Sequence, residues 1–95
     1  MRMTVVVESG LVRVDGIGFQ NIDMSSLPAD LHAMQWYETF GDEEYCDPVT
    51  RIVNRNEHIT NLDAYANVLA QFGVMKAEYD AAQAEQAAIE TIVKV

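Results

Sequence analysis

Residues Leu31–Cys46 read LHAMQWYETFGDEEYC, and this stretch decides the fold of the first half of the chain. Apolar and polar residues alternate on both sides of a short polar break, which is typical of a strand, a turn and a returning strand. We place the turn at Phe40-Gly41-Asp42 and the returning strand at residues 43–46. The stretch therefore predicts a β-hairpin.

Alternate side chains of the first hairpin strand point to opposite faces of the sheet. His32, Met34 and Trp36 share one face, and the other face carries Ala33, Gln35 and Tyr37. We expect Trp36, the only tryptophan, to supply core area, because truncating a buried aromatic side chain costs about 3–5 kcal/mol. The tip and outer edge of the hairpin are expected to hold the solvated acids Glu38, Asp42, Glu43, Glu44 and Asp47. Like charges at an edge discourage aggregation.

Three short β-prone runs precede the hairpin and predict an antiparallel meander. They are Thr4–Glu8, Leu11–Val14 and Ile17–Met24, and Asp15-Gly16 between the last two is a strong turn signal. Residues 25–30 form a loop by composition. After the hairpin, Val49–Val53 is expected to form a last short strand and 54–57 a turn.

A long helix is predicted for the remainder of the chain. Thr60 or Asn61 can cap its start, and Asp63 falls in the acidic first turn that helices favour. No proline interrupts the chain from there to about Lys94. About 30 residues at ~1.5 Å each give a helix of ~45 Å, which is longer than the small sheet can cover.

The helical segment carries a heptad pattern over four heptads. Position a falls on Tyr65, Phe72, Tyr79, Gln86 and Val93, and position d on Val68, Met75, Ala82 and Ile89. Only Gln86 is polar among them, and a lone polar residue in such a seam fixes register and stoichiometry. Alanines favour helix on the outer face.

Two interpretations of this stripe stay open for its first half. Leu62, Leu69 and Val74 widen the apolar face there, as in an ordinary amphipathic helix that packs on its own sheet. In the second half the seam is narrow and few local strands remain to cover it, which favours packing against copies of the chain. Gly73, on the outer face, is a candidate for a bend or break between the halves.

Length and composition limit the class of protein. The 95 residues suit one domain, and 49% apolar with 22% charged residues indicates a globular chain. A net charge of −9 argues against nucleic-acid and membrane-surface roles. No run approaches the ~18 apolar residues of a membrane span, and we expect no secretory signal in the first residues. The lone Cys46 excludes an internal disulfide framework and suits a reducing compartment.

Candidate chemical sites find little support in the sequence. His32, Cys46 and His58 are the only soft metal ligands, and their spacing matches no zinc motif. Asp42-Glu43-Glu44 lacks the alternating ligands of a calcium loop. Cys46 and His32 lack a third residue to orient them as nucleophile and base. The sequence predicts no enzyme activity, no metal and no cofactor.

The segments HAMQWYETFGDEEY and NEHITNLDAY resemble a group of short tailed-bacteriophage proteins. The resemblance covers about the middle third of the chain and implies a β-rich start, a terminal helix and a structural role near the tail or tail fibre. A smaller residue or proline is expected in these proteins where His58 stands. The matching residues are His32, Ala33, Gln35, Trp36, Tyr37, Gly41, Glu44, Asn56, Glu57, Ile59 and Thr60.

We therefore predict an α+β fold, with a β-rich head over residues 1–59 and a C-terminal helix over residues 60–95. The expected function is that of a non-enzymatic virion component, tail or tail-fibre associated, which assembles through a coiled coil with itself or with another virion protein. The predicted interface residues are Trp36, Tyr37, Phe40, Phe72, Met75, Tyr79, Ala82, Gln86, Ile89 and Val93.

Two alternatives remain from other functional classes. One is an assembly chaperone that binds a fibre subunit in the host cytoplasm and leaves before the particle is complete. The other is a small acidic inhibitor whose charge mimics nucleic acid and captures a basic host protein. For the structural component, the expected location is the virion, preceded by the host cytoplasm before assembly.

Overall fold

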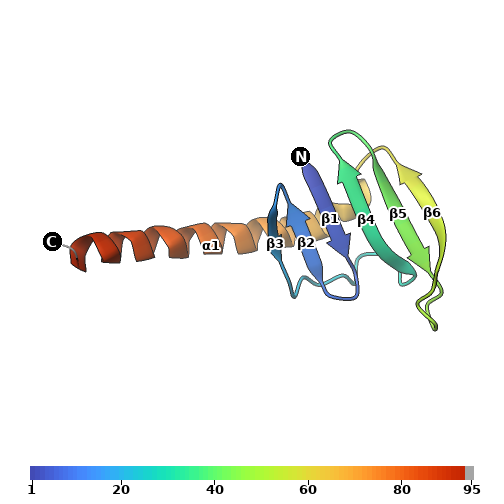
Figure 1. Ribbon diagram of the computed structural model, residues 1–95, viewed down its shortest axis with the longest axis horizontal. Helices are drawn as coiled ribbons and strands as arrows, with labels where there is room; N and C mark the ends of the chain where they lie inside the picture. The colour runs from blue at the N-terminus through green and yellow to red at the C-terminus, as the bar shows by residue number, and fades with distance from the viewer. Residues whose placement is uncertain (94–95) are drawn as a thin grey trace.

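The computed structural model describes the backbone of residues 1–93 and the side-chain surroundings of residues 1–90. A six-stranded antiparallel sheet is followed by a C-terminal helix, which confirms the predicted α+β class (Figure 1). The elements are β1 (Arg2–Val6), β2 (Leu11–Val14), β3 (Ile17–Phe19), β4 (Leu31–Tyr37), β5 (Gly41–Cys46), β6 (Val53–Ile59), the short 3₁₀ helix η1 (Asp63–Tyr65) and α1 (Ala66–Val93).

The strands lie in the order β3-β2-β1-β4-β5-β6. The first three form the predicted meander, although β3 ends at Phe19 and residues 20–24, which were expected to continue that strand, lie in the following loop. The last three form a second antiparallel run. The two runs join where β1 pairs with β4, with Met3 opposite Trp36 and Val5 opposite Met34. These four side chains are all buried on one face, so the junction of the two runs is also the centre of the core.

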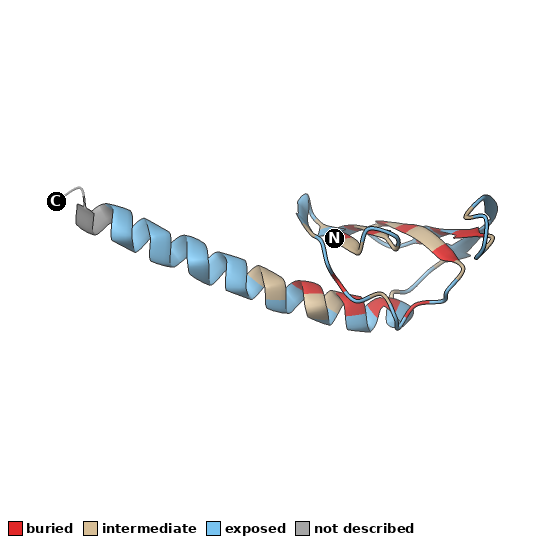
Figure 2. Ribbon diagram, turned by 90° about the horizontal axis from the view of Figure 1, so that it is seen from below, coloured by how far each residue is buried: buried red, intermediate tan, exposed pale blue. Residues whose placement is uncertain are grey.

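The helical segment and one loop cover this buried face. Tyr65, Val68 and Phe72 of η1 and α1 pack against the sheet, as do Ile22 and Leu27 of the loop between β3 and β4. Figure 2 shows the buried residues gathered where the sheet and the start of α1 face each other. Residues far apart in the sequence thus form one small core.

Two hydrogen bonds fix the loop to the helix. The side-chain amide of Gln71 donates to the carbonyl oxygen of Asp23 at 2.8 Å, and its oxygen accepts from the Asp23 N–H at 2.8 Å. The loop between β3 and β4 makes few backbone hydrogen bonds within itself, and these two bonds hold it against the helix.

A β-bulge in β4 changes the predicted faces of that strand. Leu31 pairs with Tyr45 and Ala33 pairs with Glu44, so His32 is the extra residue. Leu31 therefore shares the buried face with Met34 and Trp36, and the prediction that His32 does so was wrong. Single-strand alternation gives no sign of an inserted residue.

The turn of the hairpin lies before Gly41 and not across it. Glu38, Thr39 and Phe40 connect the strands, and Glu38 adopts a positive φ of 70°. Gly41 begins β5 opposite Trp36, where a Cβ atom would lie 2.8 Å from the Gln35 carbonyl oxygen and 2.9 Å from Cε3 of the indole. This glycine is required by close packing and not by a turn.

The last strand also differs from the prediction. Residues 47–52 form a loop, whereas β6 runs from Val53 to Ile59 and includes the residues expected to form a turn. Asp47 Oδ1 accepts the N–H groups of Val49 and Thr50, and Arg51 has a positive φ of 61°, so the chain turns before β6 begins. Pairing with β5 outweighs the weak strand preference of asparagine in β6.

The long helix is present and continues through Gly73 without a break. The predicted cap at Thr60 or Asn61 is not formed, because Leu62 is the N-cap residue of η1 and no side chain caps it. Asn61 Oδ1 accepts the N–H of Asp63 at 3.1 Å in the turn just before the helical segment. From residue 77 to residue 90 every side chain is exposed, because α1 leaves the sheet past β3 and projects from the head (Figures 1 and 2). The molecule consequently measures 59 Å along its longest axis.

Candidate protein-interaction surfaces

The first half of the apolar stripe packs on the chain's own sheet. Tyr65, Val68 and Phe72 are buried and Met75 is half-buried. The Phe72 ring meets the edge of Phe19 in β3 at a centroid distance of 5.3 Å. Of the two interpretations of the stripe, the amphipathic helix holds for this half. Phe72, predicted as an interface residue, therefore has little surface to offer a partner.

The second half of the stripe lies beyond the sheet. Tyr79 retains one ring contact with Phe19 at 5.9 Å and is still 50% exposed, and Ile89 is 48% exposed. Ala82 and Gln86 are exposed as well, while Val93 lies outside the residues whose side chains are described. The seam predicted for self-association is thus open to solvent up to Glu90.

The aromatic residues of the β4–β5 hairpin divide between core and surface. Trp36 is 6% exposed and its indole N–H donates to the Glu38 carbonyl oxygen, so it is a core residue and not an exposed anchor. Tyr37 is half-buried on the other face of the sheet, and Phe40 is 41% exposed at the turn. Phe40 stacks on His58 of β6 at 5.6 Å. Of the three, Phe40 offers the most surface.

A buried carboxylate joins the sheet to the start of the helical segment. Glu43 is 8% exposed; its Oε1 accepts from the Tyr45 hydroxyl at 3.1 Å and its Oε2 from the Tyr65 hydroxyl at 2.5 Å. The prediction that Glu43 is a solvated acid at the hairpin tip was wrong. The signal was available in the strand alternation, because Glu43 shares its face with Gly41 and Tyr45.

The environment of Glu43 suits a structural tie and not a reaction centre. Both carboxylate oxygens already accept a phenol hydroxyl, which satisfies a buried charge. Burial, and then the hydrogen bond to Glu43, raises the pKa of Tyr45 to about 12 and raises the pKa of Tyr65 as well. Both phenols thus remain donors at neutral pH. A hollow of about 370 Å³ lies beside them.

The three soft metal ligands do not converge. His32 Nδ1 lies 4.0 Å from Glu8, Cys46 is buried with its thiol 3.6 Å from the Asp30 carbonyl oxygen, and His58 faces Asp42 at 3.3 Å. Among residues 1–93, no group of three or more histidine, cysteine or acidic side chains is placed to hold a metal ion.

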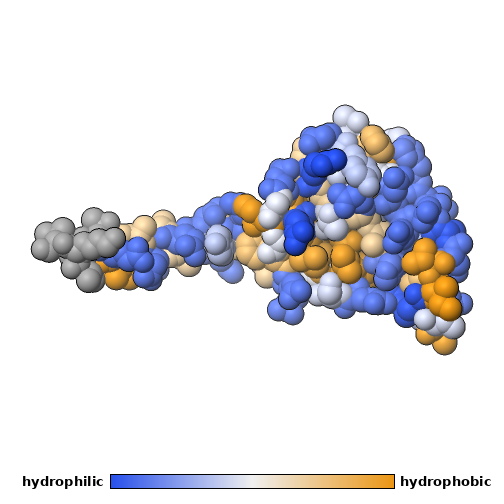
Figure 3. All heavy atoms as spheres, viewed as in Figure 1, coloured by the Kyte–Doolittle hydropathy of each residue, from blue (hydrophilic) through white to orange (hydrophobic). Residues whose placement is uncertain are grey.

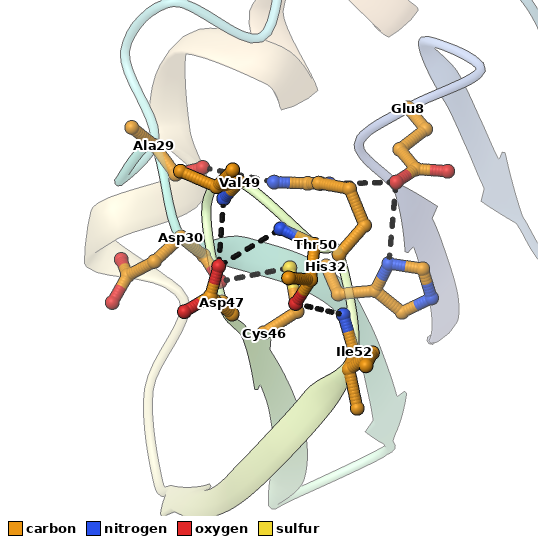
Figure 4. Close-up of polar contacts among 10 residues, drawn as sticks. Glu8, Ala29, Asp30, His32, Cys46, Asp47, Val49, Thr50 and Ile52 are labelled. Atoms are coloured by element: carbon orange, nitrogen blue, oxygen red, sulfur yellow. Dashed lines mark hydrogen bonds and ion pairs between the residues drawn. The ribbon is translucent and has the colours of Figure 1, made fainter.

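Polar contacts hold the β5–β6 loop against the β1–β2 turn and the segment that precedes β4. Figure 4 shows Glu8 between the loop and His32. Arg51 Nε donates to Glu8 at 2.7 Å, and its Nη1 donates to the Ala29 carbonyl oxygen at 3.2 Å. Together with the turn at Asp47, these bonds give the loop a defined shape.

This loop carries exposed apolar side chains. Val49 is 88% exposed, Ile52 67% and the adjoining Val53 45%. Figure 3 shows an apolar patch at the lower right of the head, where Figure 1 places the β5–β6 loop, at the end of the sheet farthest from the projecting helix. An apolar patch on a shaped loop is typical of a contact surface.

The face of the sheet that the helix does not cover is mainly polar. It is hollowed by about 540 Å³, and Thr4 and Gln35 are hydrogen-bonded at 2.5 Å within it. Asp42, Glu44 and Asn56 line its other side. The lining of this hollow carries several polar and charged side chains, whereas most small-molecule sites are lined predominantly by apolar ones.

Comparisons of the chain with protein-family models, with curated proteins and with solved structures give no match. Within the described residues, no helix is both long enough and apolar enough to cross a membrane. The surfaces above and the sequence resemblance are accordingly the basis for a functional proposal.

Proposed function

We propose that this protein is a non-enzymatic structural component of a tailed-phage virion, and that it assembles through the projecting part of α1. The partner of this helix is a second copy of the chain or a helix of a neighbouring tail or tail-fibre protein. The phage assignment rests on the sequence resemblance, and the assembly mechanism rests on the shape of the molecule.

One observation carries the assembly mechanism. Over residues 77–90 the helix has no buried side chain, yet it continues the same apolar stripe that packs on the sheet further back. Tyr79, Ala82 and Ile89 are spaced as a coiled-coil seam requires. A helix of this length held away from its own head gains stability when a second helix covers that seam.

The energetics favour association over isolation. Burying apolar area contributes about 25 cal/mol per Å², so covering Tyr79 and Ile89 in each copy contributes several kcal/mol in favour of a dimer. The isolated segment depends on helix propensity and on pairs such as Lys76–Asp80, and one such pair contributes only about 0.2–0.5 kcal/mol. Packing against a second helix therefore stabilises the segment more than its own side-chain pairs do.

The direction of the seam supports a position for the partner beside the sheet. Because the stripe continues from Phe72 and Met75, its outer half faces the side on which the sheet lies. A partner helix on this stripe lies next to the β3 edge, where Ile17 is 40% exposed. The head is then free to dock elsewhere through Phe40 and the apolar patch of the β5–β6 loop.

The native mass of the protein tests this mechanism. We expect light scattering to give more than one chain for the wild type and a lower mass for Ile89→Asp, which places a charge in the seam. Ala84→Asp adds the same charge on the outer face and should keep the wild-type mass. The near-ultraviolet signal of Trp36 verifies that the head stays folded. A monomeric wild type contradicts self-association.

The virion assignment has its own experiment. Mass spectrometry of purified particles should find the chain at a fixed ratio to the tail proteins. Its presence in infected cells and absence from particles contradicts the assignment and supports an assembly chaperone.

A further inference from the structure

Strand β6 is an open edge of the sheet. It is the last strand in the order, paired with β5 on one side only, and Val53 to His58 are all exposed. The N–H and C=O groups along its outer side are therefore available for a further strand. Ile59, at its end, is half-buried.

Edges of this kind are usually protected from pairing by proline, lysine, like charges or bulges. Within β6 there is no proline and no lysine. Asn54 is an extra residue near its start, because Tyr45 pairs with Arg55 and Cys46 with Val53, and the register from Arg55 to Ile59 is regular. Its two charged residues, Arg55 and Glu57, are of opposite sign. Both face the helix side of the sheet, because they pair with Tyr45 and Glu43.

We propose that β6 pairs antiparallel with β6 of a second copy, about a twofold axis at Asn56. Arg55 of each copy then lies opposite Glu57 of the other, and the two Asn56 residues lie opposite each other. The two sheets become one continuous sheet. This surface is separate from the helix seam and does not depend on the proposed function.

The charges select this register. A twofold axis perpendicular to the sheet must lie midway between the two copies of one residue, since directly opposite residues share a face. An axis at Arg55 places two guanidinium groups opposite each other, and an axis at Glu57 places two carboxylates opposite each other. Either pair of like charges destabilises the pairing. An axis at Asn56 gives two attractive pairs. Asn56 is also the midpoint of the strand Val53–Ile59.

The side chains are placed to make the new pairs. Arg55 lies over the Tyr45 ring at 4.1 Å and donates to Glu57 of its own chain at 3.2 Å and to Asp30 at 3.4 Å. The side chains of Arg55 and Glu57 are about half-exposed. A guanidinium has five N–H donors, so Arg55 can keep these contacts and bind Glu57 of the second copy.

The fold leaves room for this interface. Figure 1 shows α1 leaving the molecule past β3, at the opposite edge of the sheet from β6. Pairing through β6 and pairing through the helix therefore use opposite ends of the molecule. If both operate, they build a linear assembly in which heads and helices alternate.

Mixing two charge-reversed full-length variants tests the proposal. Arg55→Glu gives a strand with two carboxylates, and Glu57→Arg gives a strand with two guanidinium groups. Neither variant should self-associate through β6, whereas their equimolar mixture restores both attractive pairs between unlike chains. Both are made in the Ile89→Asp chain so that helix association does not contribute. Sedimentation over a concentration series measures the association, and Trp36 fluorescence verifies folding.

We expect the Ile89→Asp parent to dimerise weakly, each charge variant alone to bind at least about tenfold more weakly, and the mixture to recover the dimer. A monomeric parent overturns the proposal, as does a mixture that remains monomeric. Arg13→Glu mixed with Glu44→Arg is the control for net charge, because both residues lie on the other face of the sheet. The proposal is also overturned if these two control variants associate with each other as strongly as the two β6 variants do, while neither control variant associates with itself.

Discussion

Tyr65 donates a hydrogen bond of 2.5 Å to the buried carboxylate of Glu43, and this bond ties the start of the helical segment to the middle of β5. The carboxylate also accepts from Tyr45, so one charge holds together a strand and the 3₁₀ turn that precedes α1. Because α1 is straight and long, a small change in this anchor moves its far end by a large distance. The anchor therefore sets where the exposed seam lies relative to the head.

Replacing Tyr65 with Phe should destabilise the head. The variant leaves Oε2 of Glu43 without its phenol donor in a buried site, which costs about 1.5–3 kcal/mol for a hydrogen bond to a charged group. Urea unfolding followed by Trp36 fluorescence measures the change. Tyr37→Phe, which removes a hydroxyl from the opposite face of the sheet, is the control. Equal losses in the two variants contradict a special role for the Glu43 contact.

Alkaline pH should unfold the protein through the same tyrosines. The pKa of Tyr45 is raised to about 12 and that of Tyr65 is raised too, in both cases first by burial and then by Glu43. A phenol whose folded pKa lies above the unfolded value of about 10 contributes stability that is complete below pH 10 and is lost as the pH rises.

The free energy of unfolding should therefore fall above pH 10, by about 1.4 kcal/mol per pH unit for each tyrosine that ionises only after unfolding. Urea titrations between pH 9 and pH 12, with tyrosinate absorbance recorded in parallel, measure this slope. In Tyr65→Phe the slope should be smaller. If the slope is unchanged in that variant, groups other than Tyr65 cause the pH dependence of the free energy of unfolding.

Two glycine replacements should have opposite effects. In Gly41→Ala the new Cβ meets the Gln35 carbonyl oxygen at 2.8 Å and the Trp36 ring at 2.9 Å, so we expect a loss of about 1–3 kcal/mol. Gly73→Ala meets nothing within 4 Å on the exposed side of α1 and should stabilise the helix by about 1 kcal/mol. Thermal unfolding of both variants provides the comparison. A neutral Gly41→Ala contradicts the close packing of β4 on β5.

The sequence patterns predict the local elements well because their causes are local. The Asp15-Gly16 turn, the meander and the helix all follow from residues that are neighbours along the chain. The errors arise where distant contacts decide. Asn54–Glu57 lacks strand preference and becomes β6 because β5 offers it a partner, and Gly41 is needed because Trp36 lies opposite it.

The same distinction explains what was missed at the candidate surfaces. The heptad pattern gives the position of the stripe, but only the extent of the sheet decides that Phe72 is buried and Ile89 exposed. Glu43 was grouped with its acidic neighbours by composition, although strand alternation puts it on the same face as Tyr45; only the hydrogen bond from Tyr65 depends on a distant part of the chain. The sequence alone does not predict whether the strand Val53–Ile59 lies at the edge of the sheet or inside it.

Gln86 provides the sharpest test of the seam, because it is the one polar residue in an otherwise apolar heptad pattern. Its amide donates to Glu90 at 3.4 Å on the surface of α1, so it has no role in the head. Polar residues at such positions fix register and lower stability, so Gln86→Ile should tighten self-association about tenfold and admit more than one oligomeric state. Sedimentation equilibrium measures both effects. Ala84→Ile introduces the same side chain on the outer face, and if it tightens association equally, the seam does not lie along Tyr79, Ala82, Gln86 and Ile89.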